Sequence, residues 1–281
     1  MDTPVWRRRS NRFKGLLDEG DSALALWVTI PWPSAVEIAG AWGVDAALID
    51  MEHTTMSLES AERMIVAAEL AGVTPVVRPP GVDAVLVGRL LDAGAQGVLF
   101  PRIEDGAEAA AARKSLRHAP DGTRGWGGAH TRHAMWQGES AIGGRLPADR
   151  GVYTSEYIDK ARSDLVSLFL VETVRGVENI EEILDLGKPD AVDFGRGDFS
   201  AEVGFDDDAC DEAFESVLRA CRARGIGINV APCQAARLHY PGCYSVIGLD
   251  ALLLSRGIRA AVDEARAVFS AGPGMDGGAQ S

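Results

Sequence analysis

Lysine is the residue whose scarcity says most about this sequence. The chain has 281 residues and 28 Lys and Arg in total, yet only four of them are lysine: Lys14, Lys114, Lys160 and Lys188. An enzyme that works through a Schiff base needs a lysine amine in its active site. Chemistry of that kind is therefore limited to four positions, and each can be tested against the predicted fold.

An excess of positive charge and a long apolar run are also missing. The formal net charge is −13 at pH 7, which disfavours binding to nucleic-acid backbones or anionic membranes. No apolar run could cross a bilayer, and the basic start MDTPVWRRRSNRFKG lacks the apolar core of a signal peptide. The four cysteines form no CxxC pair, as is typical of reduced thiols. We expect a cytoplasmic protein whose partners are neither nucleic acid nor membrane.

Short apolar segments alternate with amphipathic ones along the chain. LALWVTI, AALIDM and GVLFP show little polar alternation, which is typical of parallel strands buried on both faces. The sequence predicts strands at Leu24–Ile30, Ala46–Met51, Thr74–Arg78, Gly97–Pro101, Leu165–Val171, Ala191–Phe194, Gly227–Val230 and Ser245–Gly248.

The amphipathic segments between these strands are predicted helices. SLESAERMIVAAELAG begins at Ser57, and it and GVENIEEILDLG both end in glycine, a common helix stop. Eight strands alternating with helices predict an α/β fold, a (β/α)8 TIM barrel. A doubly wound sheet is the alternative, but it usually carries GxGxxG after its first strand, where this chain has Pro31-Trp32-Pro33.

We expect residues 1–270 to form a single barrel domain and residues 271–281 to be a disordered tail. The segment 118–151 interrupts the alternation and is rich in Gly, Arg, His and Trp. Long loops within compact domains are usually functional or disordered. Two roles remain open for the segment 118–151: an active-site lid and a subunit contact.

Catalytic groups of a TIM barrel gather at the carboxyl ends of its strands. Glu172 and Asp198 follow two neighbouring predicted strands, so both carboxylates project at this rim. Mg²⁺ or Mn²⁺ takes one or two carboxylates, together with water and substrate oxygens. His53 and Arg78 follow two further strands at the same rim. A metal, a base and an arginine together suit enolate chemistry.

None of the four lysines is predicted at this rim. Lys14 precedes the barrel, Lys114 and Lys160 fall in helical or loop segments, and Lys188 precedes the sixth strand at the opposite end. A metal-stabilised enolate is therefore favoured over a Schiff base.

Seven segments together resemble the HpcH/HpaI family of metal-dependent (class II) hydroxy-oxo-acid aldolases. They are ALWVTI, ALIDMEHTTMSLE, TPVVRPPGVDAVLVGRLLDAGAQGVLFPRI, RGWG, VETVRGVENIEEIL, VDFGRGDFSAEVGF and IGLDALLLSRGI, in family order over roughly residues 15–268. The resemblance implies an aldehyde-lyase that joins the enolate of pyruvate, or a related 2-oxo acid, to an aldehyde and cleaves 4-hydroxy-2-oxo acids. The implied cofactor is a divalent metal, Mg²⁺ or Mn²⁺, with Co²⁺ as a further candidate.

The resemblance also assigns residues by position. Glu172 and Asp198 match the metal ligands, and His53 matches the catalytic histidine. Arg78 matches the arginine that holds the 2-oxo oxygen and stabilises the enolate.

The implied substrate contacts lie around the same rim. Trp27 matches a tryptophan that lines the site. The turn Gly195, Arg196, Gly197 and Asp198 matches the one whose backbone N–H groups, at its last two residues, bind the substrate carboxylate.

Asp92 matches the aspartate assigned as partner to the histidine, but it ends the third predicted helix, at the opposite rim. It could reach His53 only across a subunit contact, and Asp50 is a local substitute. The resemblance implies a homo-oligomer, a hexamer in which neighbours exchange the last helix, so a shared site is an expected arrangement.

Three positions depart from the family pattern. Met51 replaces a glycine, Leu170 replaces a glutamine, and Arg196 replaces a proline. Leucine cannot donate a hydrogen bond, and Arg196 could bind a second carboxylate. A repurposed synthase, citrate-synthase-like or forming a C–C bond with decarboxylation, is therefore an alternative, and a non-catalytic binding or assembly barrel is another.

Overall fold

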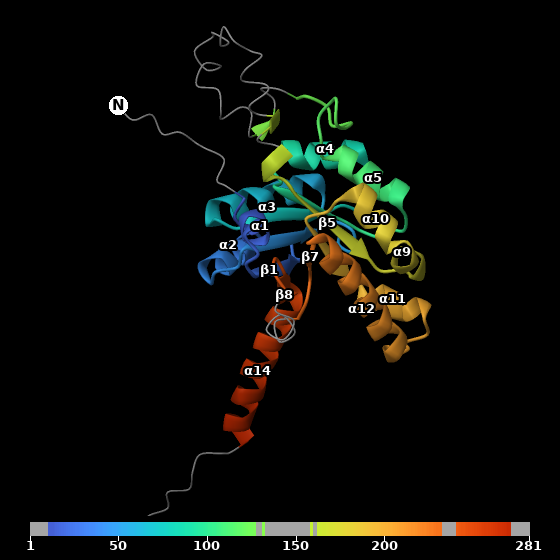
Figure 1. Ribbon diagram of the computed structural model, residues 1–281. Coiled ribbons are helices and arrows are strands. Elements are labelled where there is room, and N and C mark those ends of the chain that lie inside the picture. The colour runs from blue at the N-terminus through green and yellow to red at the C-terminus, as the bar shows by residue number, and fades with distance from the viewer. Residues whose placement is uncertain (1–10, 128–130, 133–157, 160–161, 232–239, 271–281) are drawn as a thin grey trace, which may run out of the picture.

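The chain folds around eight parallel strands that form a single sheet (Figure 1). The computed structural model describes residues 11–127, 131–132, 158–159, 162–231 and 240–270. The strands are β1 (Ala23–Val28), β2 (Ala46–Asp50), β3 (Thr74–Arg78), β4 (Gly97–Phe100), β5 (Val166–Val171), β6 (Ala191–Phe194), β7 (Gly227–Ile228) and β8 (Tyr244–Leu249). Each lies within two residues of its predicted bounds.

The sheet closes on itself at its two ends. Its strand order runs β7-β6-β5-β4-β3-β2-β1-β8, with every neighbouring pair parallel. A bridge between Asn229 and Tyr244 joins the end of β7 to β8, and the Val230 N–H donates to the Tyr244 carbonyl at 2.9 Å. The predicted (β/α)8 barrel is thereby confirmed.

Helices connect the strands and surround the barrel in Figure 1. They are α1 (Arg12–Glu19), α2 (Pro33–Ala41), α3 (Leu58–Ala71), α4 (Ala84–Asp92), α5 (Gly106–Ser115), α9 (Val174–Glu178), α10 (Ile180–Gly187), α11 (Arg196–Glu202), α12 (Asp207–Arg224) and α14 (Asp250–Ser270). The predicted ends of α3 are confirmed: the Ser57 hydroxyl caps its first turn and Gly72 ends it in the left-handed conformation.

The segment GVENIEEILDLG differs from its prediction as one helix ending in glycine. It forms α9 and α10, which break at Asn179, whose side chain donates to the Glu104 carbonyl at 3.0 Å. The residue that ends α10 in the left-handed conformation is Lys188, with φ of 47°, and not Gly187.

The strands separate two apolar layers, which explains their lack of polar alternation. Leu48 and Val76 belong to the cluster inside the barrel, and their neighbours Ile49 and Val77 to the cluster under the helices. Phe13 of α1 joins the inner cluster, where its ring meets the Tyr244 ring edge to face at 5.4 Å. Helix α1 therefore covers the amino-terminal end of the barrel and leaves the carboxyl end open.

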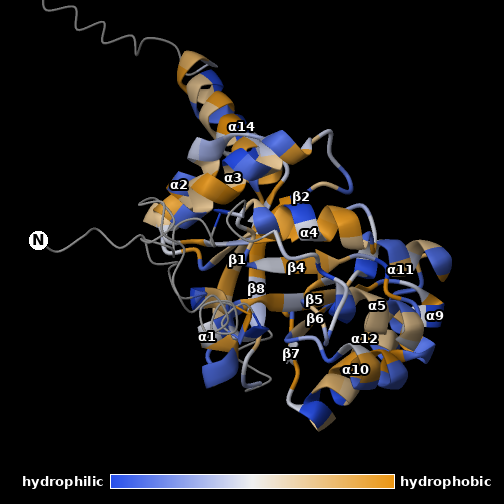
Figure 2. Ribbon diagram, turned by 90° about the horizontal axis from the view of Figure 1, so that it is seen from above, coloured by the Kyte–Doolittle hydropathy of each residue, from blue (hydrophilic) through white to orange (hydrophobic). Residues whose placement is uncertain are grey.

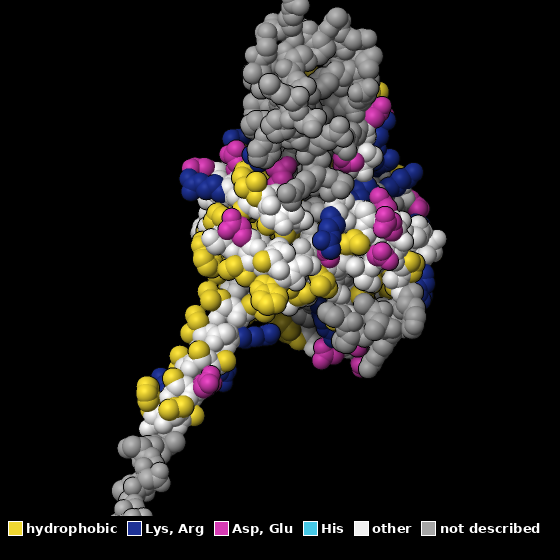
Figure 3. All heavy atoms as spheres, turned by 90° about the vertical axis from the view of Figure 1, so that its left-hand side faces the viewer, with side chains coloured by type: hydrophobic (Ala, Val, Ile, Leu, Met, Phe, Trp, Pro, Cys, Tyr) yellow, Lys and Arg dark blue, Asp and Glu magenta, His cyan; other side chains and the backbone are white. Residues whose placement is uncertain are grey.

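Helix α14 leads away from the barrel in both ribbon views (Figures 1 and 2). Its first residue is anchored: the Asp250 carboxylate accepts from the backbone N–H groups of Thr29 and Ile30 at 2.9 and 3.0 Å. All the residues from 251 to 270 are exposed. Figure 3 shows apolar side chains along this helix, and Leu254 and Ile258 are 50% and 56% exposed. Among the described residues, no helix has the length and apolarity needed to cross a membrane.

Candidate active site

A pocket of about 270 Å³ opens at the carboxyl ends of the strands. It is lined by Trp27, Thr29, Asp50, Arg78, Leu170, Glu172, Asp193, Gly195, Asp198, Asn229 and Leu249. Six of these are residues that the sequence assigned to the site. The fold therefore brings together side chains from β1, β2 and β3 with others from the ends of β5 and β6.

Arg78 is the most tightly held side chain of this pocket. Its Nε and Nη2 donate to the two carboxylate oxygens of Asp50 at 2.9 and 2.7 Å, and its Nη1 lies 3.2 Å from Glu52 Oε2. The guanidinium covers the Trp27 ring, with Cζ 4.3 Å from the ring centroid. A planar guanidinium with a bidentate partner and an aromatic face is fixed in orientation. Further N–H bonds of Nη1 and Nη2 are left for the oxygen of a ligand.

Asp50 holds Arg78 and also shapes the turn that carries the histidine. Burial alone would raise the pKa of Asp50, but its hydrogen bonds and charge pairing with Arg78 hold that pKa below its usual value. Its Oδ1 also accepts the backbone N–H groups of Glu52 and His53, at 3.0 and 3.4 Å. The His53 ring is 61% exposed, and its Nε2 lies 3.6 Å from Glu52 Oε2.

Glu172 and Asp198 meet on the other side of the pocket. The backbone N–H of Arg102, a residue in the left-handed conformation with φ of 50°, donates to Glu172 Oε1 at 3.1 Å. A Cβ atom at Gly195 would lie 2.4 Å from Glu172 Cβ and 2.7 Å from its Oε2, so the close approach requires glycine there. Burial, a hydrogen bond with Asp198 and the negative charge of Asp198 raise the pKa of Glu172 to about 8.

This carboxylate pair fits a hard divalent ion. Mg²⁺ and Mn²⁺ use one or two protein carboxylates and complete their coordination with water and substrate oxygens. Glu172 is buried and Asp198 is exposed, and burial together with the negative charge of Asp198 raises the pKa of Glu172, so a bound cation would neutralise two like charges. In the part of the chain that the structure describes, no cluster of three or more His, Cys, Asp or Glu side chains is arranged to hold a metal. Glu172 and Asp198 are therefore the residues that would hold it.

No role was predicted from the sequence for four residues of this region. Glu52 faces Arg78, and Arg102 supplies the N–H that holds Glu172. Asp193 is buried in the pocket wall, where Asn229 Nδ2 donates to its Oδ1 at 2.8 Å and burial raises its pKa. Glu52 and Arg102 stand at strand ends, which was a usable signal. Asp193 lies within a strand and Asn229 just after one, where no motif marks them.

Asp92 and Arg196 lie outside this pocket. Asp92 ends α4, and Arg124 Nη2 donates to its Oδ1 at 2.9 Å, so within one chain it is paired with Arg124 and not with His53. Arg196, which the sequence offered as a binder of a second carboxylate, is engaged by two aspartates of its own chain. Its guanidinium donates to Asp207 and Asp211 of α12 at 2.8 and 2.5 Å, and it does not line the pocket.

The other departures from the family pattern fall on either side of the strands. Leu170 is 4% exposed and lines the pocket, so an apolar surface stands where a hydrogen-bond donor was expected. Met51 belongs to the apolar cluster under the helices, away from the pocket. Gly197 lies in α11 with open space around it.

The segment 118–151 is described only in part. His118 Nδ1 lies 3.3 Å from the Arg124 carbonyl, and Arg132 pairs with Glu69 of α3 at 2.9 Å. The second contact ties the segment to α3. The rest of it, Lys160 and the tail 271–281 lie outside the described residues. None of the three described lysines lines the pocket.

The barrel and its rim of carboxylates and clamped arginine define a TIM-barrel protein with a polar pocket at the carboxyl ends of its strands. The family described as HpcH/HpaI aldolase/citrate lyase matches residues 23–236. The chain belongs to this family.

Relatives resemble the chain over most of its length. A hydroxypyruvate/pyruvate aldolase from Paraburkholderia phytofirmans is 33% identical over 254 residues, covering 88% of this chain and 90% of the relative. A 4-hydroxy-2-oxo-heptane-1,7-dioate aldolase from Shigella sonnei is 30% identical over 258 residues, covering 89% and 93%. The crystal structure of a family protein from Burkholderia cenocepacia has a TM-score of 0.77 at 30% identity, covering 92% of this chain and 100% of that one.

Proposed function

We propose that this chain is a divalent-metal-dependent aldolase that joins the enolate of pyruvate, or a related 2-oxo acid, to an aldehyde and cleaves the corresponding 4-hydroxy-2-oxo acid. One observation carries the proposal: a pocket in which the Arg78 guanidinium, clamped by Asp50, lies on the opposite side from the Glu172–Asp198 carboxylate pair. The relatives named above are aldolases of this kind of substrate.

Each side of the pocket supplies one part of the chemistry. Glu172 and Asp198 would hold Mg²⁺ or Mn²⁺, with Co²⁺ as a further candidate, and the ion would polarise the 2-oxo group. Arg78 binds the 2-oxo oxygen and stabilises the negative charge that develops there in the enolate. The N–H groups of Gly197 and Asp198, at the start of α11, bind the substrate carboxylate. The Trp27 ring packs against the Arg78 guanidinium and helps to fix its orientation.

His53 moves the proton of the aldol hydroxyl. Its ring is exposed, and its Nε2 lies 3.6 Å from Glu52 Oε2, the carboxylate oxygen that also faces Arg78. A histidine is suited to this task because its ordinary pKa lies near neutrality. Since Asp92 pairs with Arg124 in its own chain, it can serve His53 only from a neighbouring subunit.

The chain assembles into a homo-oligomer, a hexamer by the family resemblance, in which α14 packs on a neighbouring subunit. A helix that is exposed along its whole length and carries several large apolar side chains is typical of an interface. Exchange of this helix would place residues of one subunit near the site of another.

Isotope exchange tests the aldolase proposal without knowledge of the aldehyde. Pyruvate methyl protons should exchange with solvent deuterium in the presence of Mn²⁺ or Mg²⁺, stop exchanging with EDTA and exchange again when metal is restored. Glu172→Gln should abolish the exchange. Full exchange in metal-free protein would overturn the metal-dependent mechanism.

The synthase alternative is separated by product analysis with oxaloacetate as the donor. The aldolase proposal expects decarboxylation without addition to an acceptor acid. Formation of a condensed tricarboxylate would favour the synthase. Leu170 remains the departure that could favour it, because Arg196 turns towards α12.

A further inference from the structure

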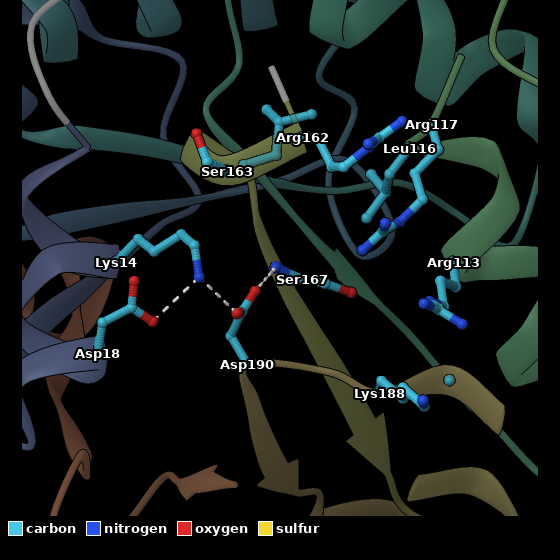
Figure 4. Close-up of a pocket in the computed structure, with 12 residues that line it drawn as sticks. Lys14, Asp18, Arg113, Leu116, Arg117, Arg162, Ser163, Ser167, Lys188 and Asp190 are labelled. Carbon is cyan, nitrogen blue, oxygen red and sulfur yellow. Dashed lines mark hydrogen bonds and ion pairs between the residues drawn. The ribbon is translucent and has the colours of Figure 1, made fainter. Parts of the chain in front are cut away.

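A second pocket lies at the opposite end of the barrel. It has a volume of about 280 Å³ and is walled by α1, α5, the end of α10 and the segments that lead into β5 and β6 (Figure 4). Catalysis in this fold takes place at the carboxyl ends of the strands, so the aldol chemistry proposed above makes no use of this pocket.

Positive charge dominates the pocket although the chain as a whole is acidic. Five cationic side chains and two carboxylates line it, in a chain of net charge −13: Lys14, Arg113, Arg117, Arg162 and Lys188, with Asp18 and Asp190. Lys14 Nζ is neutralised by Asp190 and Asp18 at 2.7 and 3.1 Å, and Arg162 pairs with Asp121. The other three cations, within the described residues, form no salt bridge and no side-chain hydrogen bond. An anion would therefore meet three cationic side chains that have no ion-pair partner among the described residues.

Two buried donors in the pocket also lack an acceptor. Arg113 Nε and Ser167 Oγ are shielded from solvent and have no hydrogen-bond partner among the described residues. Ser167 is 8% exposed. Its backbone N–H binds Asp190 at 2.7 Å, but Figure 4 shows its hydroxyl directed to the other side, towards Arg113. Buried donors without partners are costly, and a ligand oxygen would satisfy both.

Lys188 occupies a position where the backbone favours another residue. It ends α10 with φ of 47°, the left-handed conformation that glycine adopts without strain. A lysine in this conformation is strained, and backbone strain of this kind is found at functional positions. Its side chain lines the pocket from the side opposite α1 (Figure 4). The surrounding charge has a further effect: burial and the charges of Arg113 and Arg162 lower the pKa of Arg117.

We propose that this pocket is a binding site for a phosphate group, either free phosphate or that of a small phosphorylated metabolite. Guanidinium forks, a lysine and a serine hydroxyl are the donors that phosphate uses in proteins. The volume holds a phosphate together with a few further atoms. Ser167 lies near the start of β5, and the Glu172 carboxylate follows the end of the same strand. The proposed phosphate site is therefore separate from the substrate site, at the other end of the barrel.

Titration calorimetry of the full chain with EDTA present tests the proposal, with inorganic phosphate and glycerol 3-phosphate as separate probes. Arg113→Gln, Arg117→Gln and Lys188→Gly should each weaken binding at least tenfold, since each removes one charge-assisted contact. Lys188→Gly is informative because glycine fits the left-handed position, so the fold is retained. Lys114→Gln is the matched control: it removes the same charge from an exposed position of α5 and should leave affinity unchanged.

Saturating pyruvate with Mn²⁺ should leave phosphate binding intact, because the two pockets are at opposite ends. Stronger binding of the glycerol ester than of inorganic phosphate would identify a phosphorylated metabolite as the ligand, and the reverse would identify free phosphate. Equal affinity in the variants and Lys114→Gln, displacement by pyruvate, equal binding of acetate at matched ionic strength, or no binding at millimolar phosphate would each overturn the proposal.

Discussion

Arg78 and Asp50 face each other in register on β3 and β2 and form a two-bond ion pair in the candidate active site, at 2.9 and 2.7 Å. Their side chains are 10% and 3% exposed. A buried pair of this kind is weak evidence for stability, because desolvation of both charges opposes their attraction. Its value lies in geometry: Asp50 fixes the plane of the guanidinium against Trp27 and leaves the remaining N–H bonds for a ligand.

Asp50→Asn should lower kcat/KM for pyruvate exchange by roughly 100-fold. The amide offers one acceptor oxygen where the carboxylate offers two, so the Arg78 guanidinium would shift and would stabilise the developing enolate charge less well. Asp83→Asn is the matched control, since Asp83 caps the exposed start of α4 and asparagine caps equally well. Steady-state kinetics with a thermal melt of each variant makes the measurement. An Asp50→Asn enzyme of normal activity and normal fold would show that Arg78 needs no clamp.

Gly195→Ala should weaken Mn²⁺ binding by at least tenfold. The added Cβ would meet Glu172 Cβ at 2.4 Å, so the Glu172 side chain must shift from its present position. Gly197→Ala, two residues on, meets nothing within 4 Å and keeps its N–H, so metal affinity should stay normal. Calorimetric titration of both variants with Mn²⁺ compares them. Equal affinities would mean that the pair does not hold the metal.

The raised pKa of Glu172 predicts a pH-dependent stability of the metal-free protein. Its pKa is about 8 in the folded chain against an ordinary value of 4.5, so the folded state favours the protonated form. The stabilisation is present below about pH 4.5 and is lost as the pH rises to about 8. Metal-free Tm should therefore fall between pH 6 and pH 9, and the rise in Tm on adding Mn²⁺ should be larger at pH 9.

Glu172→Gln should flatten this part of the pH profile, because glutamine does not titrate. The difference between wild type and variant should reach several degrees, since about 1 kcal/mol shifts the Tm of a chain this size by roughly 2–4 °C. Scanning calorimetry in EDTA at each pH gives the comparison. Parallel profiles for the two proteins would show that another group is responsible.

The barrel could be predicted from the sequence because most of its strands are buried on both faces. Leu48 and Ile49, or Val76 and Val77, serve opposite layers of the core, and both layers need apolar side chains. Once the strands are placed, their carboxyl ends give the rim, and Arg78 and Glu172 follow from strand position alone. The barrel topology alone gives the positions of these rim residues, so no side-chain contact had to be predicted.

Side-chain direction was beyond the reach of the sequence. Arg196 follows β6 at the rim as expected, but two aspartates of α12 attract its guanidinium, and their proximity depends on how α11 and α12 pack. Asp193 was missed because its role depends on Asn229 and Tyr244, which reach it only when the barrel closes. The left-handed residue that ends α10 is Lys188 and not a glycine, and only the backbone angle of Lys188 shows this.

The exposed face of α14 predicts that disrupting it will dissociate the oligomer. Leu254, Ile258 and Val262 are spaced four residues apart, so they lie on one face of the helix, and each is at least 40% exposed. Replacing Leu254 and Ile258 with serine removes apolar surface that a neighbouring subunit would cover, and light scattering should then report a smaller assembly. Arg259→Gln on the same helix, which loses only an ion pair at 3.6 Å with Asp263, should keep the parental size. If neighbouring subunits share the site, the double variant should also lose kcat while its isolated barrel stays folded, because Asp92 would no longer come near His53. An unchanged assembly in the double variant would contradict the exchange of α14.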